Sequence, residues 1–446
     1  MLILISVIIV LQLYISIKSL INGACFMLSV RILIPDAARL ILFDISLNTA
    51  CTLLLASIFF IKYVTEQKHE SMNLLNTLNR FILFFLISSL IITFIPDYTP
   101  WKIQISTLIQ FFITQLLPIF LLTCIIRTPK DIIKFIKVFS YSFSICIIYA
   151  IGCFIMKIPY PYNQIFIDYF GYARDANMIL EIESVQGGVA GRIIGTPSAD
   201  SYSFGMIVPI AFTIQYCLYY YLKGKWNLVL TILLGIGVLL TTRRSPIISV
   251  LIFLFILFLE YDMRKKTKYL RWAMVIISGV FIAILIFPEM AFLKNIIETV
   301  FFFWDDKVAA SNGVSGSSVS LREYQFFYTI NQIKKDWLFG NGWGATYYGY
   351  HPNMHGWEGI VFSTLMQLGV WGIILWSALF CTAYKYSAMF FNKKINCKAF
   401  MLSAVTLCLF TDTIYLFFIL LGAVILNKLH LLHPKTNNIY ENSIRL

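Results

Sequence analysis

Charged residues are scarce in this chain and make up 13% of its 446 residues. Hydrophobic residues make up 59%, and the mean hydropathy is +0.79. Apolar runs of about 20 residues, the length that crosses the hydrocarbon core of a bilayer, recur along the sequence. A soluble fold has no use for so much apolar surface, so this composition excludes a soluble globular protein and indicates a polytopic membrane protein.

Other missing features exclude further classes of protein. The first 20 residues, MLILISVIIVLQLYISIKSL, lack the basic start and the A-x-A cleavage site of a signal peptide, so we expect a retained first span. The nine cysteines show no disulfide framework and no metal-binding spacing. They fall in or beside apolar segments, and we expect them to be small buried hydrophobic residues.

The apolar runs predict an all-α polytopic membrane protein, with about twelve transmembrane helices in a single integral membrane domain over residues 1–446. The region 21–43, which Arg31 and Asp36 interrupt, is expected to be an outer re-entrant or interfacial piece. The last two spans form either a shallow hairpin or one long helix. The expected spans are roughly 2–20, 44–63, 80–95, 103–126, 133–156, 203–222, 227–242, 246–261, 272–288, 359–384, 399–411 and 413–428.

The distribution of positive charge predicts the orientation. With both termini in the cytoplasm, most of the 35 Lys and Arg residues fall in short inner connectors, as the positive-inside rule requires. Two long polar segments, 157–202 and 289–358, then form outer, periplasmic-side loops. The second is expected to hold short amphipathic helices at 292–304 and 321–338. The net charge of +13 therefore reflects membrane topology and does not indicate a nucleic-acid partner.

Three arginine motifs lie where the outer segments meet the spans. Arg243 and Arg244 occupy the turn of LLTTRRSPIIS, against the positive-inside bias. Arg192 lies in the glycine-rich GGVAGRIIGTPSADS, where the backbone can approach a ligand closely. Arg322 opens a helical pattern that ends in Gly340, Gly342 and Gly344, which a C-cap and turn also explain. Snorkelling at the interface is the alternative for Arg243 and Arg244, but guanidinium groups suit bidentate phosphate binding.

The stretch YGYHPNMHGWEG gathers two of the five histidines of the chain. His351, His355 and Glu358 have the spacing i, i+4, i+7, which on a helix resembles a two-histidine, one-carboxylate metal site. Pro352 and Gly356 make the first part a loop and weaken that reading. Interfacial polar residues in an aromatic belt are the other alternative.

Taken together, these motifs resemble the O-antigen polymerase and O-antigen ligase superfamily of bacterial membrane glycosyltransferases. The resemblance covers about residues 190–375. The family's Arg-x-x-Gly segment matches Arg192 to Gly195, and its T-x-S-R turn matches TTRR, with Arg244 in the place of the family arginine. Its loop arginine before nPLlGxGxG matches Arg322 before DWLFGNGWG.

The chain departs from the family at its last motif, a His-Asn pair ahead of G-x-x-G. Gly369 and Gly372 supply the glycines, but the usual spacing back from Gly369 reaches Glu358 instead of a histidine. The general base is therefore left open among Glu358, His355 and His351. The departure favours the polymerases, because the ligases keep the histidine more faithfully.

The resemblance implies a GT-C-like enzyme without bound metal or cofactor, in the cytoplasmic (inner) membrane of a bacterium. It would polymerise undecaprenyl-diphosphate-linked repeat units of an O-antigen (lipopolysaccharide), capsule or exopolysaccharide. Arg192, Arg244, Arg322 and Arg243 would bind the diphosphate. The partners it implies are a lipid-linked glycan donor and acceptor, membrane lipid and a chain-length regulator. The alternatives are a ligase that transfers polymer to the lipid A core and a twelve-span flippase or transporter.

Overall fold

The computed structural model describes residues 1–36, 38–40, 45–65, 74–156, 158, 160–170, 193–198, 201–241, 243–260, 266–267, 271, 318–334, 336–348, 359–390, 394–410 and 415–432. The expected span at 272–288 and the expected amphipathic helix at 292–304 lie outside these residues, as does most of the first polar segment.

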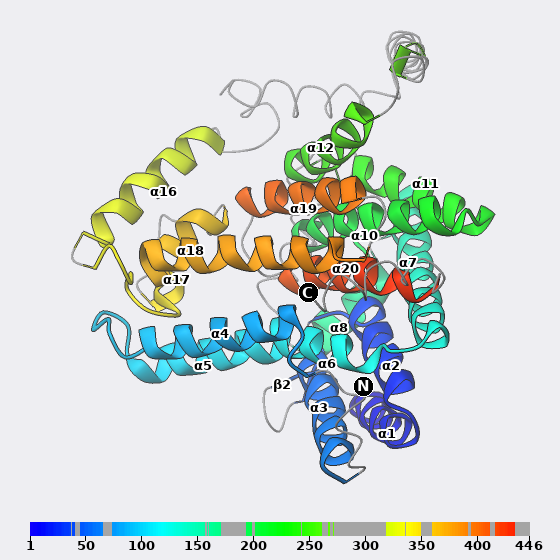
Figure 1. Cartoon of the computed structure of the whole chain (residues 1–446), viewed down its shortest axis with the longest axis horizontal. Coiled ribbons are helices and arrows are strands. Elements are labelled where there is room, and N and C mark those ends of the chain that lie inside the picture. The colour runs from blue at the N-terminus through cyan, green and yellow to red at the C-terminus, as the bar shows by residue number, and fades with distance from the viewer. Residues whose placement is uncertain are drawn as a thin grey trace, which may run out of the picture.

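Helices make up most of the described chain (Figure 1). Two strands of two residues each, β1 (Arg39–Leu40) and β2 (Ile45–Ser46), pair with each other in antiparallel orientation. The helices are α1 (Leu2–Lys18), α2 (Leu20–Leu33), α3 (Leu47–Thr65), α4 (Thr77–Ile92), α5 (Trp101–Phe111), the π-helix η2 (Phe112–Leu116), α6 (Leu117–Ile125), α7 (Pro129–Met156), α8 (Pro161–Phe170), α10 (Ser201–Leu222), α11 (Lys225–Leu240), α12 (Arg244–Leu259), α16 (Ser318–Gln332), α17 (Ala345–Tyr348), α18 (Ile360–Ala388), α19 (Lys394–Leu409), α20 (Leu416–Lys428) and the 3₁₀-helix η5 (Leu429–Leu432).

Five helical stretches in the described part are long and apolar enough to cross a membrane. Six further apolar helices have 10–17 residues. A helix of about 16 residues rises about 24 Å, less than the hydrocarbon thickness of about 30 Å. The prediction of an all-α membrane protein is therefore confirmed, whereas the number of twelve spans stays a prediction. The five are Leu47–Thr65, Trp101–Ile125, Pro129–Met156, Ser203–Leu222 and Ile360–Ala388.

The helix α2 occupies the first part of the region that was expected to be re-entrant or interfacial. Ala24, Leu28 and Ile32 are fully buried, and α2 packs against α1, α3 and α7. The interfacial alternative is therefore wrong for this part of the chain, because its apolar residues face other helices on several sides. Arg31, in the last turn of α2, is buried with them.

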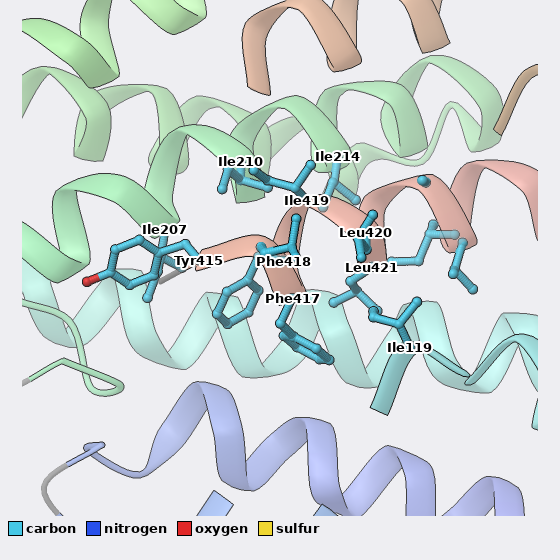
Figure 2. Close-up of a cluster of buried hydrophobic side chains, with 14 of the residues drawn as sticks. Ile119, Ile207, Ile210, Ile214, Tyr415, Phe417, Phe418, Ile419, Leu420 and Leu421 are labelled. Atoms are coloured by element: carbon cyan, nitrogen blue, oxygen red, sulfur yellow. The ribbon is translucent and has the colours of Figure 1, made fainter. Parts of the chain in front are cut away.

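The helix α20 forms the centre of the bundle, since every residue from Leu416 to Asn427 is buried. A helix that is apolar on all sides belongs in a protein core. Figure 2 shows Ile419 facing Ile210 and Ile214 of α10, while Leu421 lies beside Ile119 of α6. Helices from both halves of the chain therefore share one core around α20.

Three of the central helices run in the same direction. The Tyr221 hydroxyl, at the C-terminal end of α10, donates to Leu429 O, just after α20, at 3.1 Å. Asn427 Nδ2 donates to Tyr386 O, near the C-terminal end of α18, at 2.6 Å. The C-terminal ends of α10, α18 and α20 therefore meet, and these helices begin together at the opposite end of the bundle.

Two close contacts bring further helix ends to the place where α10, α18 and α20 begin. A Cβ added to Gly359, before α18, would lie 2.5 Å from Leu409 O at the end of α19. A Cβ added to Gly205, in the first turn of α10, would lie 3.2 Å from Cδ of Arg243, the N-cap of α12. We name this end the arginine end; it consists of the starts of α10, α12, α18 and α20 and the C-terminal end of α19.

Because α19 finishes where α20 starts, the two helices form a hairpin, not one long helix.

The cysteines follow the prediction with one exception. All nine are free thiols, and eight are buried. Cys381 is exposed, so the expectation of burial is wrong there. It lies seven residues after Ile374, which is 49% exposed, and residues at this spacing share a face of a helix. The outward face of α18 explains the exposure.

Candidate functional site

Arg243 and Arg244 lie side by side at the start of α12, in the short turn after α11. The Thr241 hydroxyl donates to Val238 O at 2.7 Å and accepts from Arg243 N at 3.5 Å, which ties the turn to the end of α11. Both arginine side chains are partly buried. The N-terminal end of a helix carries partial positive charge, so the two guanidinium groups and α12 together favour an anion.

Gly205 of α10 lies directly against this turn. An added Cβ would contact Cδ of Arg243 at 3.2 Å and side-chain atoms of Pro246 and Thr241 at 3.8 Å. A larger residue would therefore displace the Arg243 side chain. The glycine lets α10 approach the paired arginines closely.

Arg192 lies outside the described residues, but the residues that follow it are described and buried. Ile193 N donates to Leu240 O, the last residue of α11, at 3.5 Å. Gly195 of the Arg-x-x-Gly motif has no room for a side chain, because an added Cβ would lie 2.0 Å from the Phe204 ring. The chain next to Arg192 therefore runs past the end of α11, which leads into the turn that carries Arg243.

Asn163 of α8 holds this segment in place. Its Nδ2 donates to Gly195 O at 2.9 Å and to Ser198 O at 2.6 Å, while its Oδ1 accepts from the Tyr149 hydroxyl at 2.9 Å. It is fully buried. Sequence reasoning missed this positioning residue; an asparagine on the apolar face of the amphipathic segment 161–170 is the signal that indicates it.

Arg322 lies on α16, and its guanidinium stacks on the Phe410 ring at 4.9 Å from the centroid. Phe410 directly follows α19, whose last residue, Leu409, contacts Gly359. Arg322 therefore belongs to the arginine end, on a different element from Arg243 and Arg244. Glu358, the residue before Gly359, and His351 and His355 lie outside the described residues, so their roles stay predictions.

The helix α18 is interrupted at Gly369, whose φ of 60° and ψ of −156° are not helical. The loop of residues 337–342 pairs with the backbone at this break. Its amides donate to carbonyls before Gly369, and its carbonyls accept from amides after it. These bonds are Asn341 N to Met366 O at 2.9 Å, Gly342 N to Gln367 O at 2.9 Å, Val370 N to Trp337 O at 3.1 Å and Trp371 N to Leu338 O at 3.0 Å.

The glycines of GNGWG make this docking possible. Gly340 and Gly342 have φ of 69° and 91°, which other residues rarely adopt. An added Cβ would lie 2.5 Å from Gly369 N at Gly340 and 2.4 Å from Gln104 of α5 at Gly342. Gly344 N also donates to Gln367 Oε1 at 3.1 Å. The loop therefore joins α16 to α5 and α18, and its amides at 341, 342 and 344 are used within the protein.

The aromatic residues of the second polar segment divide into two groups. Tyr324, Phe327 and Trp337 are exposed and can contact a sugar. Trp343 is buried, 5.3 Å from the Phe111 ring between centroids, so it packs in the core and does not face a ligand at the surface. Its position in the docked loop directs it into the core. Tyr328 is half-buried, and the side chains of Tyr347 and Tyr350 lie outside the described residues.

Comparison with known proteins gives one match. Residues 229–377 match the family model described as O-antigen ligase, about a third of the 446-residue chain. The matched range contains Arg243, Arg244, Arg322, the docked glycine loop and the break of α18. No curated protein and no solved structure matches the chain. The resemblance to the O-antigen ligase and polymerase superfamily is therefore confirmed on these residues.

Proposed function

We propose that this membrane protein of the O-antigen ligase and polymerase superfamily polymerises oligosaccharide repeat units carried on undecaprenyl diphosphate. The observation that carries the proposal is the convergence of motifs at the arginine end. Arg243, Arg244 and Arg322 come there from two distant segments of sequence, and the chain that follows Arg192 runs beside them. Clustered guanidinium groups at the end of an apolar bundle suit a diphosphate attached to a polyprenyl chain.

The reaction is an inverting glycosyl transfer. A hydroxyl of the acceptor sugar attacks the anomeric carbon of the donor and forms the new glycosidic bond. The bond from that carbon to the diphosphate oxygen breaks, and undecaprenyl diphosphate leaves with the electron pair. Arg192, Arg244, Arg322 and Arg243 stabilise the negative charge of the leaving group. The hydroxyl proton goes to a base, for which Glu358 is the first candidate and His355 and His351 are the others.

The arginine end faces the outer side of the cytoplasmic membrane in this proposal, and both termini lie in the cytoplasm. The opposite end of the bundle supports this orientation, because lysines gather where α10, α18 and α20 finish and α11 and α19 begin. A concentration of Lys at one end is typical of the cytoplasmic side. The lysines at these helix ends are Lys223, Lys225, Lys385, Lys394 and Lys428.

Polymerase is preferred to ligase because of the departure at the last motif, where Glu358 occupies the position that a ligase gives to histidine. A flippase or transporter is disfavoured because the arginines gather at a bundle end, away from the midplane where transporters bind substrate. The acceptor is then a second lipid-linked glycan, and a chain-length regulator is a candidate partner.

The test uses a strain that makes the native glycan. Arg192, Arg244, Arg322 and Glu358 are replaced singly by alanine, and the exposed Arg80 of α4 is replaced as a control. We expect the glycan ladder to collapse to one repeat unit in the four variants and to keep its length with Arg80→Ala. Full-length ladders in all four expressed variants would show that the assignment is wrong. Free polymer on undecaprenyl diphosphate would identify a ligase instead.

A further inference from the structure

A fourth arginine, Arg31 of α2, reaches the arginine end from the N-terminal half of the chain. Its guanidinium stacks on the Phe417 ring at 3.9 Å from the centroid and donates one hydrogen bond, from Nη2 to Thr114 O in η2. Phe417 lies in the first turn of α20, and its ring points away from the isoleucines of α10 (Figure 2). Arg31 was noted in the sequence only as an interruption of an apolar region.

Arg31 is 8% exposed, and its Nη1 atom is buried without a hydrogen-bond partner in the structure. A guanidinium has five N–H donors, and here one is used. A buried charge is strongly unfavourable unless it is paired and hydrogen-bonded. Such a group calls for an anion, which would accept from the remaining donors.

Contacts with the segment before α10 fix the position of Arg31. The Thr196 hydroxyl donates to Ile32 O at 2.7 Å, and Asp36 N donates to Pro197 O at 3.0 Å. The C-terminal end of α2 is thereby bound to the chain that follows Arg192. Asp36, five residues after Arg31, is exposed, so the chain reaches the surface shortly after α2 ends.

Two other buried polar atoms without partners lie on residues that contact Asp36 or follow Pro197 in sequence. Asn48 Nδ2 donates to Asp36 Oδ1 at 2.8 Å, but Asn48 Oδ1 is unsatisfied. Ser198 Oγ, next to Pro197, is unsatisfied as well. Asp36 also interacts electrostatically with Arg31. Several unmade hydrogen bonds in one place are typical of a site that a ligand or water completes.

The nearby phenol of Tyr162 is a structural contact and not a competing acid. Its hydroxyl donates to Leu33 O at 2.9 Å, two residues after Arg31. Burial raises the pKa of Tyr162 to about 12, so the phenol stays protonated and holds α8 to the end of α2. Arg31 is therefore the group in this cluster that can neutralise an anion.

We infer that Arg31 binds a phosphate group of the lipid-linked diphosphate substrate. Arg322 stacks on Phe410, which directly follows α19, and Arg31 stacks on Phe417, in the first turn of α20. The inference rests on the proposed function and adds to it a binding position outside the matched residues 229–377. A phosphate suits the site because it offers several acceptor oxygens to one guanidinium fork.

The test measures the affinity of the purified full-length protein in nanodiscs for undecaprenyl diphosphate. Arg31→Gln is compared with Arg80→Gln, an exposed arginine on α4. We expect Arg31→Gln to weaken binding by about tenfold or more, since a hydrogen-bonded charge is lost, and Arg80→Gln to leave binding unchanged. Asp36→Asn removes a negative charge next to the site, and we expect it to tighten binding about two- to fivefold.

Competitors identify the source of the phosphate. We expect neither inorganic diphosphate nor phosphatidylglycerol to displace the lipid-linked diphosphate at equal concentration. Equal competition by either ligand would overturn the inference, because the site would then accept any free phosphate or any lipid headgroup.

A structural role for Arg31 predicts different results. Arg31→Gln would then lower the unfolding temperature without ligand, while the folded fraction would bind as tightly as the wild type.

A cryo-electron microscopy map of the wild-type complex avoids dependence on folding of the variant. We expect phosphate density about 3 Å from Arg31 Nη1, and density elsewhere would overturn the inference. If Arg322→Gln weakens binding of undecaprenyl diphosphate while Arg31→Gln does not, only the role of Arg31 is wrong. If the wild-type protein does not bind undecaprenyl diphosphate at all, the proposed function itself is wrong.

Discussion

The two ends of the helix bundle both carry positive charge, but they present it differently. At the end where α10 and α18 finish, most of the described cations are lysines; Lys223 and Lys385 are exposed, whereas Lys428 and the nearby Arg127 are partly buried. At the arginine end, Arg243, Arg244 and Arg322 are partly buried, and Arg322 stacks on an aromatic ring. The difference lies in the chemistry and burial of the side chains and not in the sign of their charge.

In the proposed function, this difference separates charge that sets topology from charge that forms a site. An exposed ammonium group stays hydrated and interacts weakly with its surroundings. A partly buried guanidinium loses hydration, is held in one orientation by packing and offers a planar fork of donors. Positive charge alone therefore does not identify a phosphate site, and the proposed site rests on several arginines meeting at one end of the bundle.

The strongest test of this comparison replaces one cation at each end. Arg244→Ala removes a partly buried charge at the start of α12, and we expect the polymerisation rate of the purified protein to fall about 10²- to 10³-fold. Lys223→Ala should leave the rate within about twofold, because an exposed charge contributes little. Equal losses in the two variants would contradict the distinction between the ends.

The second prediction concerns the loop that supports the arginine end. Gly342→Ala forces a side chain onto a φ of 91° and against Gln104, and we expect a loss of about 2 kcal/mol in the free energy of unfolding. Gly152→Ala in α7 has nothing within 4 Å of the new Cβ, so it should be neutral or stabilise by up to about 1 kcal/mol. Thermal unfolding of both variants measures the contrast. Activity of Gly342→Ala should fall as well, since α16 is joined to α18 through this loop.

Much of the fold could be predicted because membrane helices leave a strong signal. The apolar runs at 133–156 and 203–222 correspond closely to α7 and α10. The burial of α2 could not be predicted, because Arg31 looks like a surface residue until Phe417 and Thr114 surround it. Contacts between residues so far apart in the chain follow from tertiary packing and have no local signature.

The candidate site was only partly predictable for the same reason. Arg243 and Arg244 were visible as departures from the positive-inside bias, and Arg322, from a distant segment, lies at the same end of the bundle, while the side of the membrane that they face stays a prediction. A turn was one explanation offered for the glycines of GNGWG, and they lie in or beside turns, but their docking on the break at Gly369 was not foreseen. A broken helix needs partners for its backbone groups, and neither segment alone reveals which partner it has.

The third prediction separates charge from geometry at the arginine end. Arg322→Lys keeps the positive charge but removes the planar fork that stacks on Phe410. We expect the rate to fall about tenfold, which corresponds to about 1.4 kcal/mol of transition-state stabilisation. The reciprocal change at the other end, Lys385→Arg, should have no measurable effect. An unchanged rate for Arg322→Lys would show that charge alone suffices.

The smallest expected effect concerns the packing that carries the arginine end. The Ser249 and Ser403 hydroxyls hydrogen-bond at 2.8 Å between α12 and α19, and both are buried. Ser403→Ala removes the bond between the hydroxyls, while the Ser249 hydroxyl keeps its bond to Ser403 O at 3.0 Å, so the free energy of unfolding should fall by about 1 kcal/mol or less. The double variant with Ser249→Ala should lose less than the sum of the single losses, because both polar groups are then absent. Thermal unfolding of the three variants measures this coupling. Additive losses would mean that the hydroxyl pair does not join α12 to α19. The helix α12 begins at Arg244, and α19 ends beside Phe410, on which Arg322 stacks.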